Sequence, residues 1–325
     1  MIIVTGANGF IGSAMVWELN QSGIDDIICT DTVRPEDRPE LLKGLKFRQF
    51  VHTDEVLPLL RESSLLKDCQ AIFHMGACSS TLEKNVDYLR VNNTEYTQHL
   101  FELCTLHNVP YIYASSGAVY GGGENGFDDR TPPDTFSPLN PYGASKLNFD
   151  KWVVQQATTP DSWYGLRFFN VYGPNEYHKG PMSSVAYKAF KQINETGRLK
   201  LFRSHHPDYK DGEQKRDFVY VKDITRWMLE LLNKPDTANG IYNMGYGEAR
   251  TWLDMAKGIF ACMDRTLDID WIDIPEDLRK QYQYFTEAKM DKLKDQDLSL
   301  PHWPLEKGIE DYIKKYLLTA HPHFS

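Results

Sequence analysis

Tyr142 and Lys146, in the segment "PYGASK", are spaced so that both side chains lie on one face of a helix. A tyrosine hydroxyl has a pKa of about 10 and is therefore a poor base at neutral pH. A lysine ammonium held beside it favours the phenolate form. Such a pair can take a proton from a substrate hydroxyl, so the spacing indicates a site for acid–base chemistry.

The spacing alone is weak evidence, because the chain has 18 tyrosines and contains a second match, Tyr187 and Lys191. We expect that second pair to lie on an ordinary amphipathic helix. Only Tyr142 follows a strand-like segment, "PYIYASS", that ends in serines. The hydroxyl of Ser116 could donate to the substrate oxygen that Tyr142 deprotonates, although such a serine can also simply cap a turn.

The opening segment "IIVTGANGFIG" combines a short apolar strand, closely spaced glycines and the start of a helix. Gly6, Gly9 and Gly12 would let the backbone turn tightly and approach a pyrophosphate, which would face the free N–H groups of the helix N-terminus. Asp31 ends the next strand-like segment, about 20 residues further on, where an acid that binds a ribose is expected. Glycines occur in many such turns, but this combination predicts a bound dinucleotide.

The residues around Asp31 leave the type of dinucleotide open. Asp31 suits the ribose 2′-hydroxyl of NAD, whereas Arg34 and Arg38, in "DTVRPEDRPE", could hold the 2′-phosphate of NADP. The same segment could also be a solvated loop of mixed charge.

Strand and helix signals alternate along the first half of the chain, which is typical of a parallel, doubly wound sheet. The expected strands are residues 2–6, 26–31, 45–50, 70–77, 110–116 and 162–171, and the expected helices are residues 10–23, 56–66, 87–108 and 141–157. We therefore predict an α/β protein with a Rossmann domain over residues 1–170, to which segments near 217–245 return. A smaller mixed α/β substrate-binding domain is expected over residues 171–325.

Composition excludes several classes of protein. The net charge of −9 and the pI of about 5.6 argue against a general nucleic-acid or membrane-surface binder, while leaving room for a local basic pocket. Five cysteines without a CxxC pattern, and the lack of a leader or a long apolar run, predict a cytoplasmic protein. His205 and His206 have no ligand spacing around them, so no metal site is expected.

The glycine turn, Ser116 and "PYGASK" together resemble the extended short-chain dehydrogenase/reductase superfamily, which includes the NAD-dependent epimerases and dehydratases. A closer resemblance, over nearly the whole chain, is to the ADP-L-glycero-D-manno-heptose 6-epimerase family. It is carried by "FHMGACSST", "YASSGAVYGG", "RFFNVYGPNEYHKGPMSSVA", "KRDFVYVKDI" and "YQYFTEA". The resemblance implies catalytic places for Tyr142, Lys146 and Ser116, and a second acid/base at Lys179.

The resemblance also implies binding positions, residue by residue. Those expected at the cofactor are Gly6, Gly9, Phe10, Ile11, Gly12, Asp31, Thr32, Arg38, Met75, Gly76, Ala77, Cys78, Ser79, Asn92, Tyr142, Lys146, Val171 and Lys179. Those expected at the substrate are Ser116, Asn170, Pro181, Lys188, Phe202, Arg203, Ser204, His205, Arg216 and Tyr282. Arg38 stands where the family has a basic residue for NADP. Arg216 could clamp a diphosphate, or form an ion pair with a neighbouring aspartate.

Three positions depart from the pattern of the family. Pro181 replaces a serine that often follows the loop lysine, Lys188 replaces a common histidine, and a cofactor-side lysine is absent near Thr53. These departures affect the detail of substrate and cofactor contacts and leave Tyr142 and Lys179 in place.

The resemblance implies epimerisation at C6 of an ADP-heptose by transient oxidation and re-reduction with bound NADP, with NAD as the alternative. Protons would move through Tyr142 on one side and Lys179 on the other. A nucleotide sugar is thus the expected partner, and the family leads us to expect a homo-oligomer. The competing interpretations are a UDP-glucose 4-epimerase-like enzyme, in which Lys179 would have no role, and an inactive sensor that keeps the nucleotide fold.

Overall fold

The computed structural model describes residues 1–62, 64–279 and 282–325. In this part of the chain the largest element is a seven-stranded sheet, ordered β10-β6-β5-β4-β1-β2-β3. All its neighbouring strands are parallel, which confirms the expected doubly wound α/β fold. Its strands are β1 (Ile2–Thr5), β2 (Ile27–Asp31), β3 (Gln49–His52), β4 (Ala71–His74), β5 (Tyr111–Ser116), β6 (Trp163–Phe168) and β10 (Gly240–Met244).

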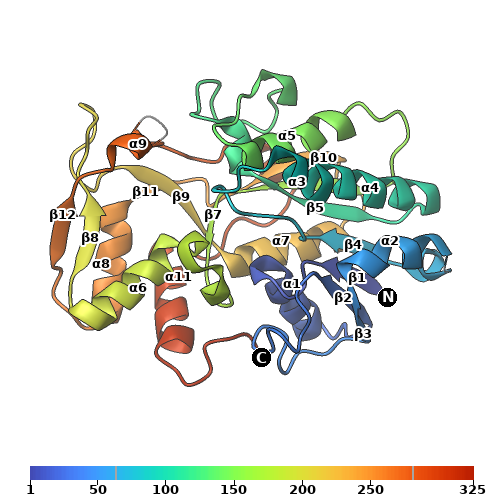
Figure 1. The fold of residues 1–325 in the computed structure, drawn as a ribbon, viewed down its shortest axis with the longest axis horizontal. Helices are drawn as coiled ribbons and strands as arrows, with labels where there is room; N and C mark the ends of the chain where they lie inside the picture. The colour runs from blue at the N-terminus through green and yellow to red at the C-terminus, as the bar shows by residue number, and fades with distance from the viewer. Residues whose placement is uncertain (63, 280–281) are drawn as a thin grey trace.

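Helices cover both faces of this sheet (Figure 1). One face carries α1 (Phe10–Gln21) and α7 (Val221–Asn233). The other face carries α2 (Thr53–Glu62), α4 (Tyr96–His107) and α5 (Pro141–Val153). Among the described residues, no helix has both the length and the apolar character needed to cross a membrane.

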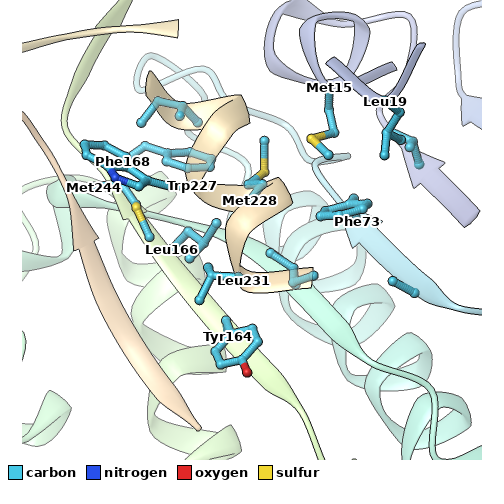
Figure 2. Close-up of a cluster of buried hydrophobic side chains, with 14 of the residues drawn as sticks. Met15, Leu19, Phe73, Tyr164, Leu166, Phe168, Trp227, Met228, Leu231 and Met244 are labelled. Atoms are coloured by element: carbon cyan, nitrogen blue, oxygen red, sulfur yellow. The ribbon is translucent and has the colours of Figure 1, made fainter. Parts of the chain in front are cut away.

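The strands are buried on both faces, so their apolar residues alternate between two cores. In β1, Ile2 and Val4 belong to the core under α1 and α7, and Ile3 belongs to the opposite one. Figure 2 shows the first of these cores. Its labelled members are Met15, Leu19, Phe73, Tyr164, Leu166, Phe168, Trp227, Met228, Leu231 and Met244.

The second half of the chain builds two smaller sheets, which lie to the left of the large sheet in Figure 1. One has the order β11-β9-β7, with β7 (Asn170–Tyr172), β9 (Lys215–Tyr220) and β11 (Ala249–Thr251). The other pairs β8 (Leu199–Phe202) with β12 (Ile269–Ile272). The accompanying helices are α6 (Val185–Thr196), α8 (Trp252–Cys262), α9 (Glu276–Arg279), α10 (Asp291–Asp295) and α11 (Leu305–Tyr312).

The expected strand over residues 162–171 was wrong as a single element. β6 ends at Phe168, and β7 continues in the three-stranded sheet beside β9. The break occurs at Phe169, whose N–H donates to Met244 O at 3.1 Å while its carbonyl accepts from Val171 N at 2.9 Å. The chain then returns through α7, which packs on α1, and through β10, which pairs with β6. The expected division into two domains remains a prediction.

Other expected boundaries shift as well, among them the ends of α1 at Gln21, of β4 at His74 and of α5 at Val153. The third strand begins at Gln49, so most of residues 45–50 lie outside it. The helix expected over residues 56–66 begins at Thr53 and ends at Glu62, and residue 63 lies outside the described residues. The long helix over residues 87–108 contains α3 (Val86–Leu89), a π-helical segment (Arg90–Glu95) and α4.

A buried ion pair joins α5 to the sheet. Asp150 Oδ2 lies 3.0 Å from Arg167 Nε, and both side chains are 0% exposed. Asp150 also accepts hydrogen bonds from the hydroxyls of Tyr113 (2.9 Å) and Ser115 (3.0 Å). Arg167 donates in turn to the hydroxyl of Tyr120 at 3.1 Å. The network fixes the helix that carries the tyrosine–lysine pair against β5 and β6.

A second buried polar group, His74, ties β1 to α4. Its Nδ1 is hydrogen-bonded to Thr5 Oγ1 at 2.7 Å and its Nε2 to Thr97 Oγ1 at 2.9 Å. Burial, with a smaller effect of the Lys146 charge, lowers the pKa of His74 to about 3. The imidazole is therefore neutral in the folded protein.

Replacing Asp150 by alanine is expected to lower the free energy of unfolding by about 3–5 kcal/mol, because a buried guanidinium is left without its counter-charge. Urea unfolding followed by circular dichroism measures the change. Glu310→Gln is the matched control, since it breaks the ion pair with Lys314 on the surface and should leave the midpoint unchanged. An Asp150→Ala protein as stable as the wild type would contradict the assigned role.

The free energy of unfolding is expected to decrease as the pH decreases, because His74 is neutral in the folded protein. In the unfolded chain the pKa of His74 is 6.5, so below that pH the unfolded chain binds a proton that the folded protein does not. The contribution of the neutral ring is complete above pH 6.5 and is lost as the pH falls towards 3. Relative to His74→Gln, wild type should lose up to ~1.4 kcal/mol of unfolding free energy per pH unit in this range. Urea unfolding at a series of pH values measures this. The same change in unfolding free energy per pH unit in both proteins would contradict the prediction.

Candidate active site

A cavity of about 340 Å³ opens at the carboxyl edge of the large sheet. Ligands bind at this edge in doubly wound folds. The lining comes from the end of β5, the start of α5, the break between β6 and β7, and a segment before α10. It includes Thr81, Ser116, Tyr142, Asn170, Gln283 and Thr286.

Ser116 and Tyr142 meet in this cavity. Ser116 caps the short 3-10 segment Gly117–Tyr120, where its Oγ accepts from Ala118 N at 3.1 Å, and it also shares a hydrogen bond with the Tyr142 hydroxyl. The serine therefore caps the turn, and its donation to a substrate oxygen stays a prediction. Burial raises the pKa of Tyr142, and the Ser116 hydrogen bond opposes this. Tyr142 is thus protonated at neutral pH until a positive charge approaches it.

Lys146 lies one helical turn further along α5 and is 5% exposed. Its Nζ donates to Ala114 O, on the strand that ends at Ser116, at 2.8 Å. Burial lowers the pKa of Lys146 to about 8, and Asp150 opposes the shift. Within the described residues the structure gives no hydrogen bond between Lys146 and the Tyr142 hydroxyl. The expected effect of the lysine on the tyrosine stays a prediction.

The glycine turn has the geometry of a phosphate cradle. Gly6 has φ +64°, and a Cβ there would lie 2.6 Å from Gly76 N. A Cβ on Gly12 would lie 1.9 Å from the carbonyl oxygen of Gly6. Gly9 precedes α1 without a side-chain cap, so the amides of Phe10 and Ile11 are available to a ligand. These features fit the pyrophosphate of a dinucleotide.

Asp31 and Arg38 hold this turn from the side of β2. Asp31 accepts from the backbone N–H groups of Asn8 and Val33, each at 3.0 Å, and its pKa is raised by burial. Arg38 Nη1 donates to Asn8 O at 2.8 Å. Thr32, beside Asp31, is exposed. Asp31 and Arg38 therefore both bind the backbone of Asn8 in the glycine turn, and their contact with a cofactor stays a prediction.

The wall over residues 75–79 follows β4 and closes against the glycine turn. Gly76 N donates to Thr5 Oγ1 at 3.1 Å. Asn93 accepts from Cys78 N at 2.8 Å and donates to Cys78 O at 3.0 Å and to Ser145 Oγ at 3.0 Å, so it joins the wall to α5. Sequence reasoning selected its neighbour Asn92, which is exposed and donates to Tyr88 O at 2.8 Å.

Lys179 lies in the 3-10 segment Tyr177–Met182 after β7. Its Nζ is 5.6 Å from the centroid of the Phe10 ring, so the half-buried ammonium rests against the glycine turn. Burial lowers the pKa of Lys179, and the carboxylate of Glu176 opposes this. Lys179 is not among the described residues that line the cavity. Its segment borders the cavity through Met182, whose Sδ accepts from Thr81 Oγ1 at 3.9 Å.

Two departures from the family pattern contact each other. Lys188 Nζ, on α6, donates to Pro181 O at 3.2 Å. Pro181 and Lys188, the two positions that depart from the family pattern, are thus hydrogen-bonded to each other.

Val171 lies on β7 and packs in the same cluster as Phe10 and Ile11. Tyr187 and Lys191 lie on α6 as expected, with Nζ 5.9 Å from the ring centroid.

The other predicted substrate residues gather around β8 and β9. Arg216 is 8% exposed, and its guanidinium carbon lies 5.5 Å from the Trp252 ring and 5.4 Å from the Tyr282 ring. Phe202 contacts Tyr282 at 6.1 Å between ring centroids. The structure therefore excludes the alternative of a surface ion pair for Arg216. Residues 203–205 form a more exposed loop, in which Arg203 lies 3.6 Å from Asp211, Ser204 N donates to Asp211, and His205 N donates to the Tyr284 hydroxyl.

Gln283 links this group to the cavity. It lines the cavity, its carbonyl accepts from Arg216, and its side chain donates to Gly121 O. Thr286, three residues on, donates to Asn170 Oδ1 at 3.5 Å. Sequence reasoning missed Gln283, Thr286 and Thr81, although the segments "YQYFTEA" and "GACSST" that contain them carried the resemblance.

Comparisons with known proteins agree with this geometry. The model of the NAD dependent epimerase/dehydratase family matches residues 2–245. A protein of Nitratidesulfovibrio vulgaris named ADP-L-glycero-D-manno-heptose-6-epimerase is 47% identical over 99% of this chain and 100% of its own length. The Fusobacterium nucleatum protein of that name is 43% identical over 98% of both chains. The crystal structure of the Helicobacter pylori ADP-L-glycero-D-manno-heptose-6-epimerase superposes with a TM-score of 0.81, at 27% identity, over 97% of this chain and 95% of that one.

The family description names a nicotinamide dinucleotide, which fits the glycine turn, and the relatives are epimerases. The chain therefore belongs to the NAD dependent epimerase/dehydratase family, within the group whose curated members are named ADP-L-glycero-D-manno-heptose-6-epimerase.

Proposed function

We propose that this protein interconverts ADP-D-glycero-D-manno-heptose and ADP-L-glycero-D-manno-heptose at C6, by transient oxidation and re-reduction. The observation that carries the proposal is the 47% identity, over 99% of the chain, to a relative named for that epimerase activity. The meeting of Tyr142 and Ser116 in a cavity at the carboxyl edge of the sheet supports it chemically.

A bound nicotinamide dinucleotide supplies a hydride acceptor and donor. The glycine turn and the uncapped start of α1 would hold its pyrophosphate, and Asp31 lies beside the turn for a ribose. NADP is the proposed form, because Arg38 lies at the turn. Burial lowers the pKa of His178 to about 4, and the nearby charges of Arg38 and Lys179 add to this shift. That cationic surrounding suits a 2′-phosphate.

Tyr142 is the proposed acid/base on one side of the reacting carbon. Its hydroxyl would exchange a proton with the C6 hydroxyl, while Ser116 donates to the same oxygen. The nearby Lys146 charge favours the phenolate that this requires. A protonated Tyr142 can return the proton when the direction of the reaction reverses.

Lys179 is the proposed acid/base on the other side. Epimerisation delivers hydride to the opposite face of the same carbon, so a single base would have to follow the oxygen as the ketone turns. Two groups on different elements, α5 and the segment after β7, need not move in this way. Burial lowers the pKa of Lys179, so its ammonium gives up a proton more readily than that of a free lysine.

Arg216 is the proposed clamp for the substrate diphosphate. Its guanidinium lies between the rings of Trp252 and Tyr282 and contacts Gln283 of the cavity. An arginine held in this way binds phosphate oxygens with little loss of side-chain entropy.

The wider setting remains part of the proposal. We infer that the product supplies heptose for a lipopolysaccharide core, that the enzyme works in the cytoplasm, and that it assembles as a homo-oligomer. The five cysteines are free thiols in the structure, as in a reducing compartment.

Lys179→Ala and Tyr142→Phe are both expected to lower the epimerisation rate by roughly 100-fold or more, because each removes one of two proton-transfer groups. NMR of the C6 configuration measures the rate, starting from ADP-D-glycero-D-manno-heptose. Lys191→Ala, which removes an amine from α6, is the matched control and should keep the wild-type rate.

UDP-glucose and UDP-galactose are included as competing substrates. Epimerisation of only the UDP-hexoses would replace the heptose assignment with a 4-epimerase. A full rate in Lys179→Ala would remove the two-base mechanism, and no turnover of any of these sugars by wild-type protein would favour the inactive sensor.

Arg38→Ala is expected to weaken NADP binding by roughly 10-fold to 100-fold and to change NAD binding little, because it removes one charge-assisted contact to the 2′-phosphate. Isothermal titration with each dinucleotide measures both constants. Arg34→Ala is the control, since Arg34 is exposed and pairs with Glu55 at 3.4 Å. Equal losses for NAD and NADP would argue against the NADP assignment.

A further inference from the structure

The loop that carries Lys179 is joined to two distant parts of the chain by one side chain, Asn175. Asn175 is 0% exposed and has a left-handed backbone, with φ +74°. Its Nδ2 donates to Ser13 Oγ on α1 at 2.9 Å. Its Oδ1 accepts from Phe324 N at 3.1 Å and is hydrogen-bonded to His323 Nδ1 at 3.1 Å. One amide therefore connects the loop, α1 and the C-terminal segment (residues 321–325).

The C-terminal segment also supports the ring on which Lys179 rests. Phe324 is 1% exposed, stacks on Trp17 with 4.5 Å between ring centroids, and shares a buried cluster with Phe10. Phe10 faces the Lys179 ammonium at 5.6 Å. The hydroxyl of Tyr177, two residues before the lysine, donates to the carbonyl of Pro322.

Glu176 closes the other side of the loop. Its buried carboxylate accepts from Gly173 N at 3.2 Å, Ser184 Oγ at 2.7 Å and the Tyr312 hydroxyl at 3.0 Å. Asn175 and Glu176, at the start of the loop, are thus both held by hydrogen bonds to other parts of the chain. Lys179 Nζ itself makes no hydrogen bond or ion pair with any described residue, so the position of the ammonium depends on how firmly its loop is held.

We propose that Asn175, together with the C-terminal segment, is a positioning element for the proton transfer by Lys179. Asn175 donates to Ser13, whose hydroxyl donates to Phe10 O at 3.1 Å. The amide therefore fixes the position of the loop relative to Phe10. The inference rests on the proposed epimerase function and adds a residue that acts through Lys179 without touching the reacting atoms.

Asn175→Gly is the sharpest variant, because glycine adopts a positive φ without strain and only the bridging amide is lost. Asn108→Gly is the matched control. Asn108 also has a left-handed backbone, with φ 51°, and its amide donates to Asp161 Oδ2 at 2.6 Å on the surface, away from the site. Both variants lose one asparagine amide at the same kind of backbone position.

The variant Asn175→Gly is expected to lower kcat by roughly 10-fold to 100-fold, because a displaced acid/base is no longer in reach. KM should stay within about twofold, since no group that contacts substrate is removed. In the Lys179→Ala background, Asn175→Gly should cause no further loss, because its effect passes through the lysine. Asn108→Gly should keep the wild-type kcat.

Two further measurements separate positioning from general destabilisation. Hydrogen exchange of the unliganded protein should become faster at residues 177–183 in Asn175→Gly and unchanged in β1 and β4. Tyr177→Phe, which removes only the hydroxyl that reaches Pro322, should lower kcat in the same direction by a smaller factor.

Additive losses in the Asn175→Gly/Lys179→Ala double variant would overturn the proposal, as would a wild-type kcat in a folded Asn175→Gly protein. If wild type itself does not epimerise the heptose, the proposed function has failed. The hydrogen-exchange result would then still report whether Asn175 holds the loop.

Discussion

Strand β6 is hydrogen-bonded along both edges, to β5 and to β10, and the rest of the structure depends on this double pairing. β5 precedes it in the chain, whereas β10 arrives some distance later, after β7, β8 and β9 of the two small sheets. The chain leaves the large sheet at Phe169 and is brought back to the same strand. The substrate-side elements therefore begin and end at the carboxyl edge of the large sheet, where the cavity opens.

Buried polar groups strengthen this junction. Arg167 of β6 pairs with Asp150 of α5 and donates to Tyr120, whose hydroxyl donates to Asn243 of β10 at 2.6 Å. Each of these groups would be costly to bury alone, so they stabilise the junction only as a connected set. The same set holds the helix of Tyr142, so the position of that side chain depends on the packing beneath it.

The loop that carries Lys179 is held in place in a different way from the helix that carries Tyr142. It has little regular structure, and it contains both a left-handed asparagine and a glycine at φ 52°. Its order comes from side chains that reach α1, α11 and the C-terminal segment. A loop held in this way can carry a charged group beside the cofactor turn without a hydrogen bond to the charge itself.

Much of the fold could be predicted, because its signals are local. Parallel strands buried on both faces leave short apolar runs, and the glycine turn must be made of glycines, since a Cβ at Gly6 or Gly12 would collide with the backbone. The break at Phe169 could not be predicted, because the partner of its N–H lies 75 residues away, at Met244. Strand propensity alone favours a continuous strand there.

The sequence by itself determined the kinds of chemistry available: a helix bearing Tyr142 and Lys146, a serine at a strand end, a dinucleotide turn and a lysine in a loop. Tertiary structure alone decided which polar residues support them. Asn93 is buried while Asn92 is exposed, and Gln283 joins Arg216 to the cavity. Such choices depend on contacts between segments far apart in the chain, and single-sequence patterns report only on neighbours along a strand or a helix.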